Sequence, residues 1–321
     1  MKNWKINLTA VFCAGLFLTG CSGGAPAPYE YSQENMDTLI SQASADSGQA
    51  GSLAGSLCVV MGDEPQPDAS VDAMSAGVFS VNDGRVLVQK NLFERRNPAS
   101  TTKIMTALLA IKEADLSELV TVGDEVLVEP GSSLAHINPG DTLTMEQLLY
   151  GLMLASGNDA AAAIAVHMAG SIEAFADQMN DLAWEIGATD THFTNPHGLT
   201  DENHYTTAYD LYLMYNEAMK YEEFRSIAGT VSYTASYTDG EGQPKTREWK
   251  NSNQYLTGQV SEPDGITAVG GKTGTTSAAG SCLVLNCQDK QNQDYVAVVL
   301  KAENRTALYE NMTNIIGEIV N

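Results

Sequence analysis

Positive charge is scarce in this chain of 321 residues. Lys and Arg together number 17, against 40 Asp and Glu, so the formal net charge at pH 7 is −23. Such an acidic excess argues against nucleic acid as a partner and against electrostatic docking to an anionic membrane surface. Any anionic substrate must therefore be bound by a local positive site that acts against the overall field. The length suits one large domain or two small ones.

Cysteine is also scarce, with five residues in all. Cys13 and Cys21 belong to the N-terminal segment, which leaves an odd number, Cys58, Cys282 and Cys287. Their spacing fits no metal site, and we expect neither a metal nor a cofactor. One disulfide at most could form, between the apolar runs around Cys58 and Cys282. The favoured alternative is that all three are buried as small hydrophobic side chains.

Long apolar runs are absent after residue 20, so no transmembrane span is expected there. Residues 1–20 combine two lysines with an apolar run too short to cross a bilayer, a pattern typical of a secretion signal. The run ends in Leu18-Thr19-Gly20-Cys21, which resembles the lipobox of bacterial lipoproteins. The resemblance implies cleavage before Cys21, lipidation of its sulfur and attachment to the outer face of the cell membrane. Simple secretion with cleavage at small residues is the alternative.

The remaining chain divides into a tether and one domain. Residues 21–55 are rich in Ser, Gly, Ala, Pro and acidic residues, as in a flexible tether. Residues 56–321 have strand-like runs at both ends and helical patterns between them. They begin with a strand over 56–62 and a hairpin over 76–91. The last third carries strand-like alternation around a turn at Asp239-Gly240, then three antiparallel strands and a helix over 304–320. We expect an α+β domain in which both ends form an antiparallel sheet around an inserted helical lobe.

Three short polar signatures lie at junctions of these elements. Ser100-Thr101-Thr102-Lys103 opens a predicted helix, Ser156-Gly157-Asn158 separates two helices, and Lys272-Thr273-Gly274 lies on a predicted edge strand. A helical spacing of three places the Ser100 hydroxyl and the Lys103 amine on one side, as an acylated serine with a lysine base requires. Each signature alone is weak. Their order and their separations of 56 and 116 residues match the serine acyl-transferases that react with penicillin.

From about Ser56 onward the sequence resembles the serine-type D-alanyl-D-alanine carboxypeptidases, the low-molecular-weight penicillin-binding proteins. The resemblance implies a β-lactamase/transpeptidase-like fold, removal of the terminal D-alanine from peptidoglycan stem pentapeptides, and inhibition by β-lactam antibiotics. The matching stretches are PASTTKIMTALLA at 98–110, GLMLASGNDAA at 151–161, NPHGL at 195–199, HYTTAYDL at 204–211 and GGKTGTTSAAGSCLV at 270–284. Many family members continue into a further C-terminal domain with a membrane helix; we expect the lipid at Cys21 to replace that anchor.

The resemblance implies a role for each residue of the three signatures that carries chemistry. Ser100 is the expected nucleophile and Lys103 its base, which needs a neutral amine. Burial and the second cation, Lys272, both lower a lysine pKa. Ser156 is expected to relay the proton to the departing D-alanine, and Asn158 to hold Lys103 and a peptide carbonyl of the substrate.

The resemblance also implies a carboxylate site and an oxyanion hole. Lys272 and the hydroxyls of Thr273 and Thr275 are expected to bind the terminal carboxylate of the substrate. The backbone N–H groups of Ser100 and Thr275 are expected to stabilise the oxyanion, a pair of donors worth several kcal/mol of barrier.

Several alternatives stay open at this point. A β-lactamase commonly needs a glutamate about 36 residues beyond the Ser-x-Asn signature, where this chain has His192. A D,D-endopeptidase would use the same site, and a non-catalytic lipoprotein that binds the cell wall or senses β-lactams would not need the nucleophile–base pair. A phosphate loop at Lys272 lacks its earlier glycine, because position 266 is Ile266. A Ser-His-Asp triad through His197 is disfavoured without G-x-S-x-G, and Asp210 is expected to anchor a loop beside the site.

Overall fold

The computed structural model describes residues 57–58, 71–129 and 131–320. The predicted signal over residues 1–20, the predicted tether over residues 21–55 and the lipidation residue Cys21 lie outside the described residues. In the described ranges, no helix is both long enough and apolar enough to cross a bilayer.

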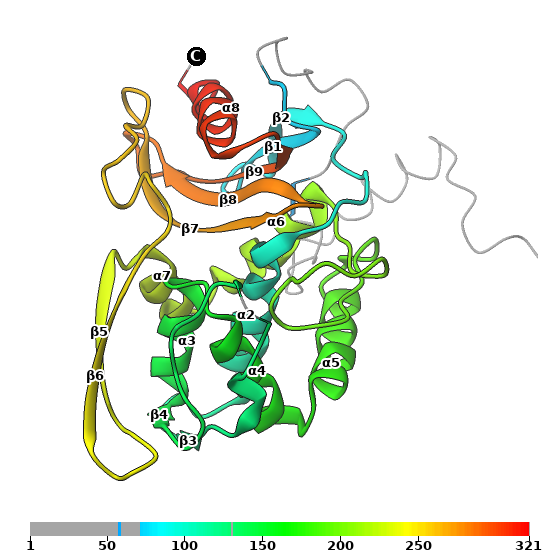
Figure 1. Cartoon of the computed structure of the whole chain (residues 1–321). Coiled ribbons are helices and arrows are strands. Elements are labelled where there is room, and N and C mark those ends of the chain that lie inside the picture. The colour runs from blue at the N-terminus through cyan, green and yellow to red at the C-terminus, as the bar shows by residue number, and fades with distance from the viewer. Residues whose placement is uncertain (1–56, 59–70, 130, 321) are drawn as a thin grey trace, which may run out of the picture. The chain divides into compact units, whose positions relative to one another are not determined.

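An antiparallel five-stranded sheet joins the two ends of the domain (Figure 1), in the order β2-β1-β9-β8-β7. The strands are β1 (Ser75–Ser80), β2 (Arg85–Lys90), β7 (Thr267–Thr276), β8 (Gly280–Gln288) and β9 (Asp294–Ala302). The predicted N-terminal hairpin and the three predicted C-terminal strands are thereby confirmed. So is the edge position of the strand that carries Lys272.

Both faces of this sheet are covered, as Figure 1 shows, with α8 (Arg305–Gly317) on one face and the helical lobe on the other. Side chains alternate along a strand, so β8 contributes to two separate cores. Val284 belongs to the core shared with the helical lobe, whereas Leu283 and Leu285 belong to the core beneath α8. Burial on both faces explains why β8 and β9 read as continuous apolar runs in the sequence.

The helical lobe lies between β2 and β7 in the chain, as predicted. Thr144 begins its second helix with a capping box that includes Gln147, and Ser171 caps the fourth. The eight-residue last helix of the lobe is not among the predicted elements, because an amphipathic run of little more than two turns is shorter than the window in which a helix is recognised from its period. The helices are α2 (Lys103–Glu113), α3 (Met145–Met153), α4 (Asn158–Ala169), α5 (Ile172–Glu185), α6 (Ala208–Ala218) and α7 (Glu222–Gly229).

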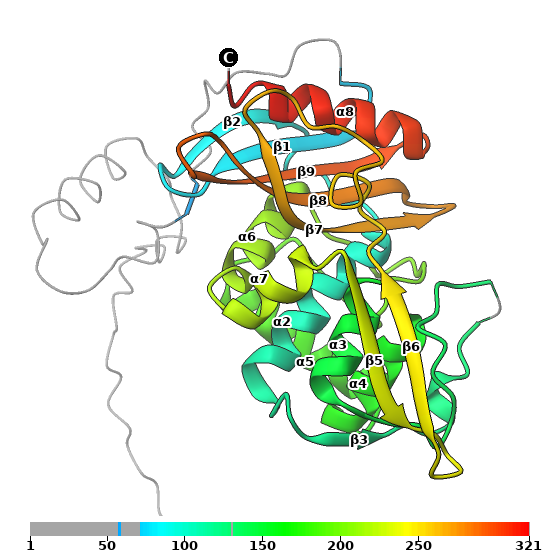
Figure 2. The ribbon, with the colours of Figure 1, turned by 90° about the vertical axis from the view of Figure 1, so that its left-hand side faces the viewer.

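A second, four-stranded sheet is the main feature that the sequence did not predict. Its order is β3-β4-β5-β6, and Figure 2 shows the long β5–β6 hairpin beside the helices of the lobe. The alternation of residues predicts strands here, but it does not tell which sheet a strand joins. The strands are β3 (Leu119–Thr121), β4 (Thr142–Thr144), β5 (Ser232–Thr238) and β6 (Pro244–Lys250).

The three cysteines of the domain are buried thiols without a disulfide, as favoured from the sequence. Cys58 lies outside any strand of the described residues, and its backbone N–H donates to the hydroxyl of Tyr212 at 2.8 Å. Burial raises the pKa of Cys58 and of Cys282 to about 11 and that of Cys287 to about 12, so all three stay protonated and unreactive near neutral pH.

Candidate active site

Ser100 lies in a 3-10 turn, Ala99–Thr102, and the α-helix begins only at Lys103. The helix predicted at Ser100 therefore begins with one 3-10 turn that leads directly into α2. A 3-10 turn has three residues per turn, which brings residues i and i+3 into line, so Ser100 and Lys103 still share one side. Ala99 adopts a φ of +50°, which non-glycine residues rarely occupy, and this lets the chain enter the turn directly after Pro98.

The amine of Lys103 is fully buried and has three oxygen neighbours. Its Nζ lies 3.0 Å from Ser100 Oγ, 2.7 Å from Asn158 Oδ1 and 2.7 Å from the backbone oxygen of His197. A neutral amine has two N–H donors and one lone pair. The two carbonyl oxygens can only accept, so they take the two N–H groups, with the Asn158 amide oriented as this bond requires. The lone pair then remains for the hydroxyl hydrogen of Ser100.

The surroundings of Lys103 favour this neutral form. Burial and the charge of Lys272 hold the pKa of Lys103 well below its ordinary value of 10.5, while the carboxylate of Asp159 acts in the opposite direction. A lowered pKa is what a lysine needs in order to accept a proton from a serine hydroxyl.

Lys272 provides a second buried amine, on the edge strand β7. Its Nζ donates to Ser156 Oγ at 2.9 Å and to the backbone oxygen of Thr273 at 2.9 Å. Burial lowers its pKa from 10.5 to about 7. Ser156 has a φ of +56° at the break between α3 and α4, the second strained non-glycine residue in the site. Thr273 Oγ1 is hydrogen-bonded to the hydroxyl of Ser252 at 2.6 Å.

Two glycines allow backbone segments to close around Ser100. Gly198 has a φ of +87°, and a Cβ there would lie 1.8 Å from the backbone oxygen of Ala99. A Cβ on Gly274 would lie 2.8 Å from the backbone nitrogen of Ser100. Strand β7 therefore runs directly past the Ser100 amide, and Thr275 is the next residue along it. The two N–H groups expected to form the oxyanion hole thus belong to neighbouring segments.

These groups open into a cleft of about 440 Å³. Ser132 and Ser133 form part of its lining on the side of Asn158, and Thr275 and Thr276 contribute from β7. The structure brings together the residues expected for the site from the signatures and the resemblance: Ser100, Lys103, Ser156, Asn158, Lys272, Thr273 and Thr275.

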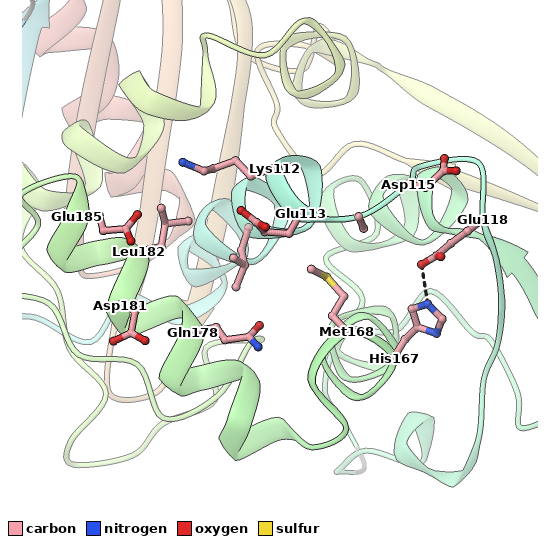
Figure 3. A pocket seen from close by; sticks show the side chains of 12 residues that line it. Lys112, Glu113, Asp115, Glu118, His167, Met168, Gln178, Asp181, Leu182 and Glu185 are labelled. Atoms are coloured by element: carbon pink, nitrogen blue, oxygen red, sulfur yellow. Dashed lines mark hydrogen bonds and ion pairs between the residues drawn. The ribbon is translucent and has the colours of Figure 1, made fainter.

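A larger hollow, about 560 Å³, lies at the other end of α2 and has no part in this arrangement (Figure 3). It is lined by the C-terminal residues of α2, including Lys112 and Glu113, and by Asp181 and Glu185 of α5. His167 pairs with Glu118 there at 2.6 Å. Within the described residues, no group of three or more His, Cys, Asp or Glu could hold a metal ion.

Two supporting residues of the site are not among those predicted from the sequence. The first is Asp159, which directly follows the Ser-Gly-Asn signature. Its carboxylate accepts hydrogen bonds from the backbone N–H groups of Ala135, Ile137 and Ala160 at 2.8–3.2 Å. It therefore ties the segment that follows the cleft-lining Ser133 to the start of α4. Only its place beside the signature could have drawn attention to it.

His204 is the second such residue. Its Nδ1 accepts from the N–H of Thr194 at 3.1 Å, so Nε2 carries the hydrogen and donates to Thr102 Oγ1 at 2.8 Å. Burial lowers the pKa of His204 to about 4, which keeps the ring neutral. His204 thus fixes the 3-10 turn that holds Ser100.

The other polar residues weighed in the sequence have structural surroundings. Burial, followed by the charge of Lys103, lowers the pKa of His197 to about 3, and its ring accepts from the N–H of Leu199 at 3.3 Å rather than from Ser100. Asp210 accepts from Asp190 N at 2.9 Å and from Thr191 Oγ1 at 2.7 Å, which confirms its expected role as a loop anchor.

The sheet and the helical lobe meet at a seam where Ser100 lies beside the buried amine of Lys103, the arrangement expected of the penicillin-binding class. The chain belongs to the D-alanyl-D-alanine carboxypeptidase family, whose sequence model matches residues 61–304. The D-alanyl-D-alanine carboxypeptidase DacF of Bacillus subtilis (strain 168) is 37% identical over 237 residues, which are 72% of this chain. The D-alanyl-D-alanine carboxypeptidase of Streptomyces sp. (strain K15) is 34% identical over 257 residues, or 76% of this chain and 86% of that protein.

Solved structures agree with the sequence comparison. The crystal structure of the Streptomyces K15 DD-transpeptidase has a TM-score of 0.72 and 31% identity, and the match covers 78% of this chain and 98% of that one. The D-alanyl-D-alanine carboxypeptidase from Mycobacterium tuberculosis H37Rv has a TM-score of 0.69 and 29% identity, over 80% of this chain and 96% of that one. The chain spans only 58% of the length of DacF.

Proposed function

We propose that this protein is a serine-type D-Ala-D-Ala carboxypeptidase that removes the terminal D-alanine from peptidoglycan stem pentapeptides. The observation that carries the proposal is the buried Lys103 amine, 3.0 Å from Ser100 Oγ, with both of its N–H groups engaged elsewhere. A binding module has no need for a lysine whose lone pair is directed at a serine hydroxyl.

In the acylation step, Ser100 Oγ attacks the carbonyl carbon of the penultimate D-alanine while Lys103 Nζ takes the hydroxyl proton. The backbone N–H groups of Ser100 and Thr275 stabilise the oxyanion. The C–N bond then breaks as Ser156 gives its hydroxyl proton to the departing amine, and Ser156 is reprotonated with the proton that Lys103 took, which returns Lys103 to its neutral form. Water hydrolyses the Ser100 ester, and the hydroxyl regains its proton.

Substrate recognition depends on the terminal carboxylate. Lys272, with the hydroxyls of Thr273 and Thr275, supplies the local positive site that a protein of net charge −23 needs for an anionic substrate. β-Lactams carry a carboxylate beside a reactive amide, so we expect them to acylate Ser100 and to inhibit the enzyme through slow deacylation.

The test is release of D-alanine from a peptide that ends in D-Ala-D-Ala. We expect release by the wild type, its loss in Ser100→Ala, and inhibition by penicillin together with covalent labelling of Ser100. Release that survives Ser100→Ala would overturn the mechanism. A wild type that releases nothing but binds the peptide would favour the cell-wall-binding alternative.

Transfer to an amine is the second candidate reaction, and the similarity to a protein described as a DD-transpeptidase favours testing it. An amine acceptor and water would compete for the same Ser100 ester. Adding an acceptor amine to the assay and measuring the ratio of transferred to hydrolysed product distinguishes a carboxypeptidase from a transpeptidase. The same assay with a cross-linked peptide tests the D,D-endopeptidase alternative.

We also propose that residues 1–20 are a lipoprotein signal, that residues 21–55 are a tether, and that lipid on Cys21 holds the catalytic domain outside the cell at the membrane face. The support is the sequence Leu18-Thr19-Gly20-Cys21 after a short apolar run. Cys21→Ala should release the protein from the membrane fraction. A variant that stays in the membrane fraction would refute the anchor.

A further inference from the structure

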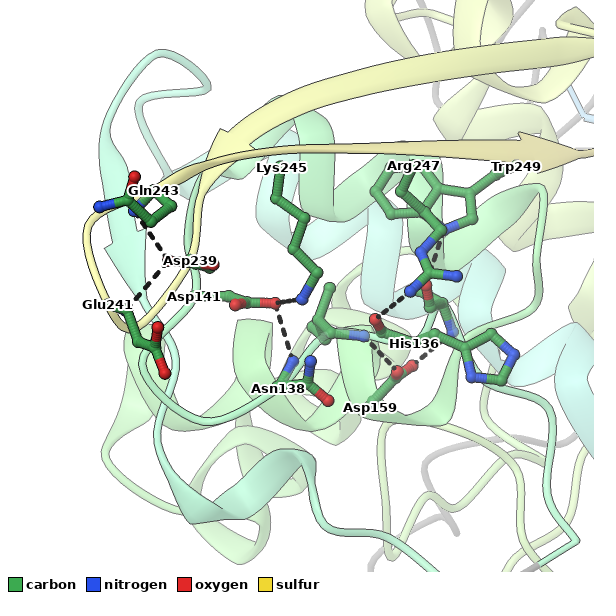
Figure 4. Close-up of polar contacts among 12 residues, drawn as sticks. His136, Asn138, Asp141, Asp159, Asp239, Glu241, Gln243, Lys245, Arg247 and Trp249 are labelled. Carbon is green, nitrogen blue, oxygen red and sulfur yellow. Dashed lines mark hydrogen bonds and ion pairs between the residues drawn. The ribbon is translucent and has the colours of Figure 1, made fainter.

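One face of strand β6, in the β5–β6 hairpin, contacts the segment of residues 135–141, here called the wall because it continues from Ser132 and Ser133 in the lining of the active-site cleft. Lys245, Arg247 and Trp249 alternate with the exposed residues Thr246 and Glu248, so the first three share the face that points toward the domain. Figure 4 shows their side chains directed at the segment of residues 135–141, which follows the cleft-lining serines at 132 and 133 in the chain.

Each of the three side chains contacts a different point of that segment. The buried Trp249 donates from Nε1 to the backbone oxygen of Ala135 at 2.8 Å, and Arg247 donates from Nη2 to the backbone oxygen of His136 at 3.3 Å. Lys245 Nζ pairs with Asp141 at 2.8 Å (Figure 4).

The opposite side of the segment is held by the start of α4. Asp159 accepts from the backbone N–H groups of Ala135 and Ile137 at 2.8 and 3.2 Å. The backbone N–H of Asn158 donates to the backbone oxygen of Ser133 at 2.8 Å, and the side chain of the same asparagine accepts from the catalytic amine. The wall therefore lies between the hairpin on one side and the start of α4 on the other.

The conformation of the segment shows why it needs support from both sides. His136 has a φ of +61°, in the left-handed region that costs a non-glycine residue of order 1–3 kcal/mol. Such a conformation persists only where the surroundings impose it. Arg247 and Trp249 bond to the carbonyl groups of His136 and of the residue before it, so β6 holds the strained turn directly.

Among the described residues, the side chain of Arg247 has one hydrogen bond, to the backbone oxygen of His136. It is half-buried, its Nε is buried without a hydrogen-bond partner, and no ion pair of Arg247 with a carboxylate is found in the described part of the chain. Partial burial of an arginine without an ionic partner has a cost in desolvation. The carbonyl of His136 is the acceptor that offsets it.

We propose that Arg247 and Trp249 are positioning residues that set the cleft wall for the peptide part of the substrate. This proposal rests on the proposed function. Because they act through residues 133–137 and not on Ser100 or Lys103, their loss is expected to weaken binding of a long peptide while the chemistry at Ser100 continues. A blocked dipeptide, which reaches little of the wall, should be affected less.

The test compares a pentapeptide ending in D-Ala-D-Ala with a blocked D-Ala-D-Ala dipeptide in the full-length protein. For Arg247→Ala we expect KM for the pentapeptide to rise about tenfold with kcat within about twofold, and kcat/KM for the dipeptide to change less than about threefold. Trp249→Phe, which removes the Nε1 donor but keeps a ring, should show the same pattern. Arg247→Lys, which keeps a donor, should restore part of the preference for the pentapeptide over the dipeptide, measured as the ratio of their kcat/KM values.

Glu248→Ala is the matched control, since Glu248 lies on the same strand but on its exposed face. This substitution should leave KM and kcat for both the pentapeptide and the dipeptide at their wild-type values. If Arg247→Ala and Trp249→Phe remain folded and the pentapeptide-to-dipeptide ratio of kcat/KM stays at the wild-type value, the positioning role is refuted. An inactive wild type would refute the proposed function instead, so the two failures are distinguishable.

Discussion

Replacing Lys272 by Met should make the protein more stable and much less active at neutral pH. Burial lowers the pKa of Lys272 from 10.5 to about 7. A difference of about 3.5 units, at about 1.36 kcal/mol per unit, means that the folded state disfavours the charged amine by about 5 kcal/mol. Met has a similar volume and no charge to desolvate, so the substitution removes this cost.

Part of that gain is lost again, because Ser156 Oγ and the backbone oxygen of Thr273 each lose a donor. At about 1.5 kcal/mol for each acceptor left without its donor, the expected net stabilisation at pH 7 is about 2 kcal/mol. The sign of the pH dependence follows from proton binding. Between pH 7 and 10.5 the unfolded chain binds a proton at Lys272 that the folded chain does not, so wild-type stability rises with pH. The advantage of Lys272→Met should therefore shrink as pH rises.

Urea unfolding at about pH 7 and about pH 9.5 measures both effects, with D-alanine release as the activity readout. We expect kcat/KM to fall about 100-fold, because a charged hydrogen bond to the substrate carboxylate is lost. Lys250→Met is the control, since Lys250 is exposed and water already solvates its charge. The reasoning is refuted if Lys272→Met is less stable than the wild type at neutral pH, or if the difference between them does not depend on pH.

Three further substitutions test the site. Ser156→Ala should slow acylation of Ser100 by penicillin at least about tenfold, because the proton relay is removed. The free energy of unfolding should change by only about 1 kcal/mol, because a single hydrogen bond to Lys272 is lost. Unchanged acylation would exclude Ser156 as the proton relay. Asp159→Ala should lower the free energy of unfolding by about 3 kcal/mol, since it leaves the buried N–H groups of Ala135 and Ile137 without an acceptor. An unchanged free energy of unfolding in urea would contradict this account. Gly198→Ala should abolish labelling of Ser100 by penicillin, because a Cβ at this position would lie 1.8 Å from the backbone oxygen of Ala99. Gly242→Ala is the control: no atom lies within 4 Å of a Cβ there, so labelling should not change.

The sequence predicted the sheet and the inserted lobe, and it named residues that the structure brings together around Ser100, because each of these features leaves a local signal. Apolar runs marked β8 and β9, and the three signatures around Ser100, Ser156 and Lys272 were short enough to recognise without any knowledge of contacts. Their convergence followed from the resemblance to a family rather than from their spacing, since sequence separation says nothing about distance in space.

The features that the sequence did not predict depend on contacts between distant residues. A 3-10 turn at Ser100 and an α-helix start have nearly the same sequence pattern, and the close approach of Gly198 and Gly274 to this turn leaves no local signal. The alternation in β5 and β6 predicted strands, but it gave no sign that β5 would join β4, which it does through a single registered pair, Thr142 with Thr238.

Scarcity of positive charge and its placement are linked in this protein. Two of its 17 cationic residues, Lys103 and Lys272, are almost fully buried in one site. On the surface of a strongly acidic protein, their charges would be offset by neighbouring carboxylates and by solvent. In the seam between sheet and lobe, burial lowers the pKa of each amine, and the charge of Lys272 lowers that of Lys103 further, so one can serve as a base while the other attracts a carboxylate. Burying two amines destabilises the folded protein, and the large apolar cores on both faces of the sheet offset this loss of stability.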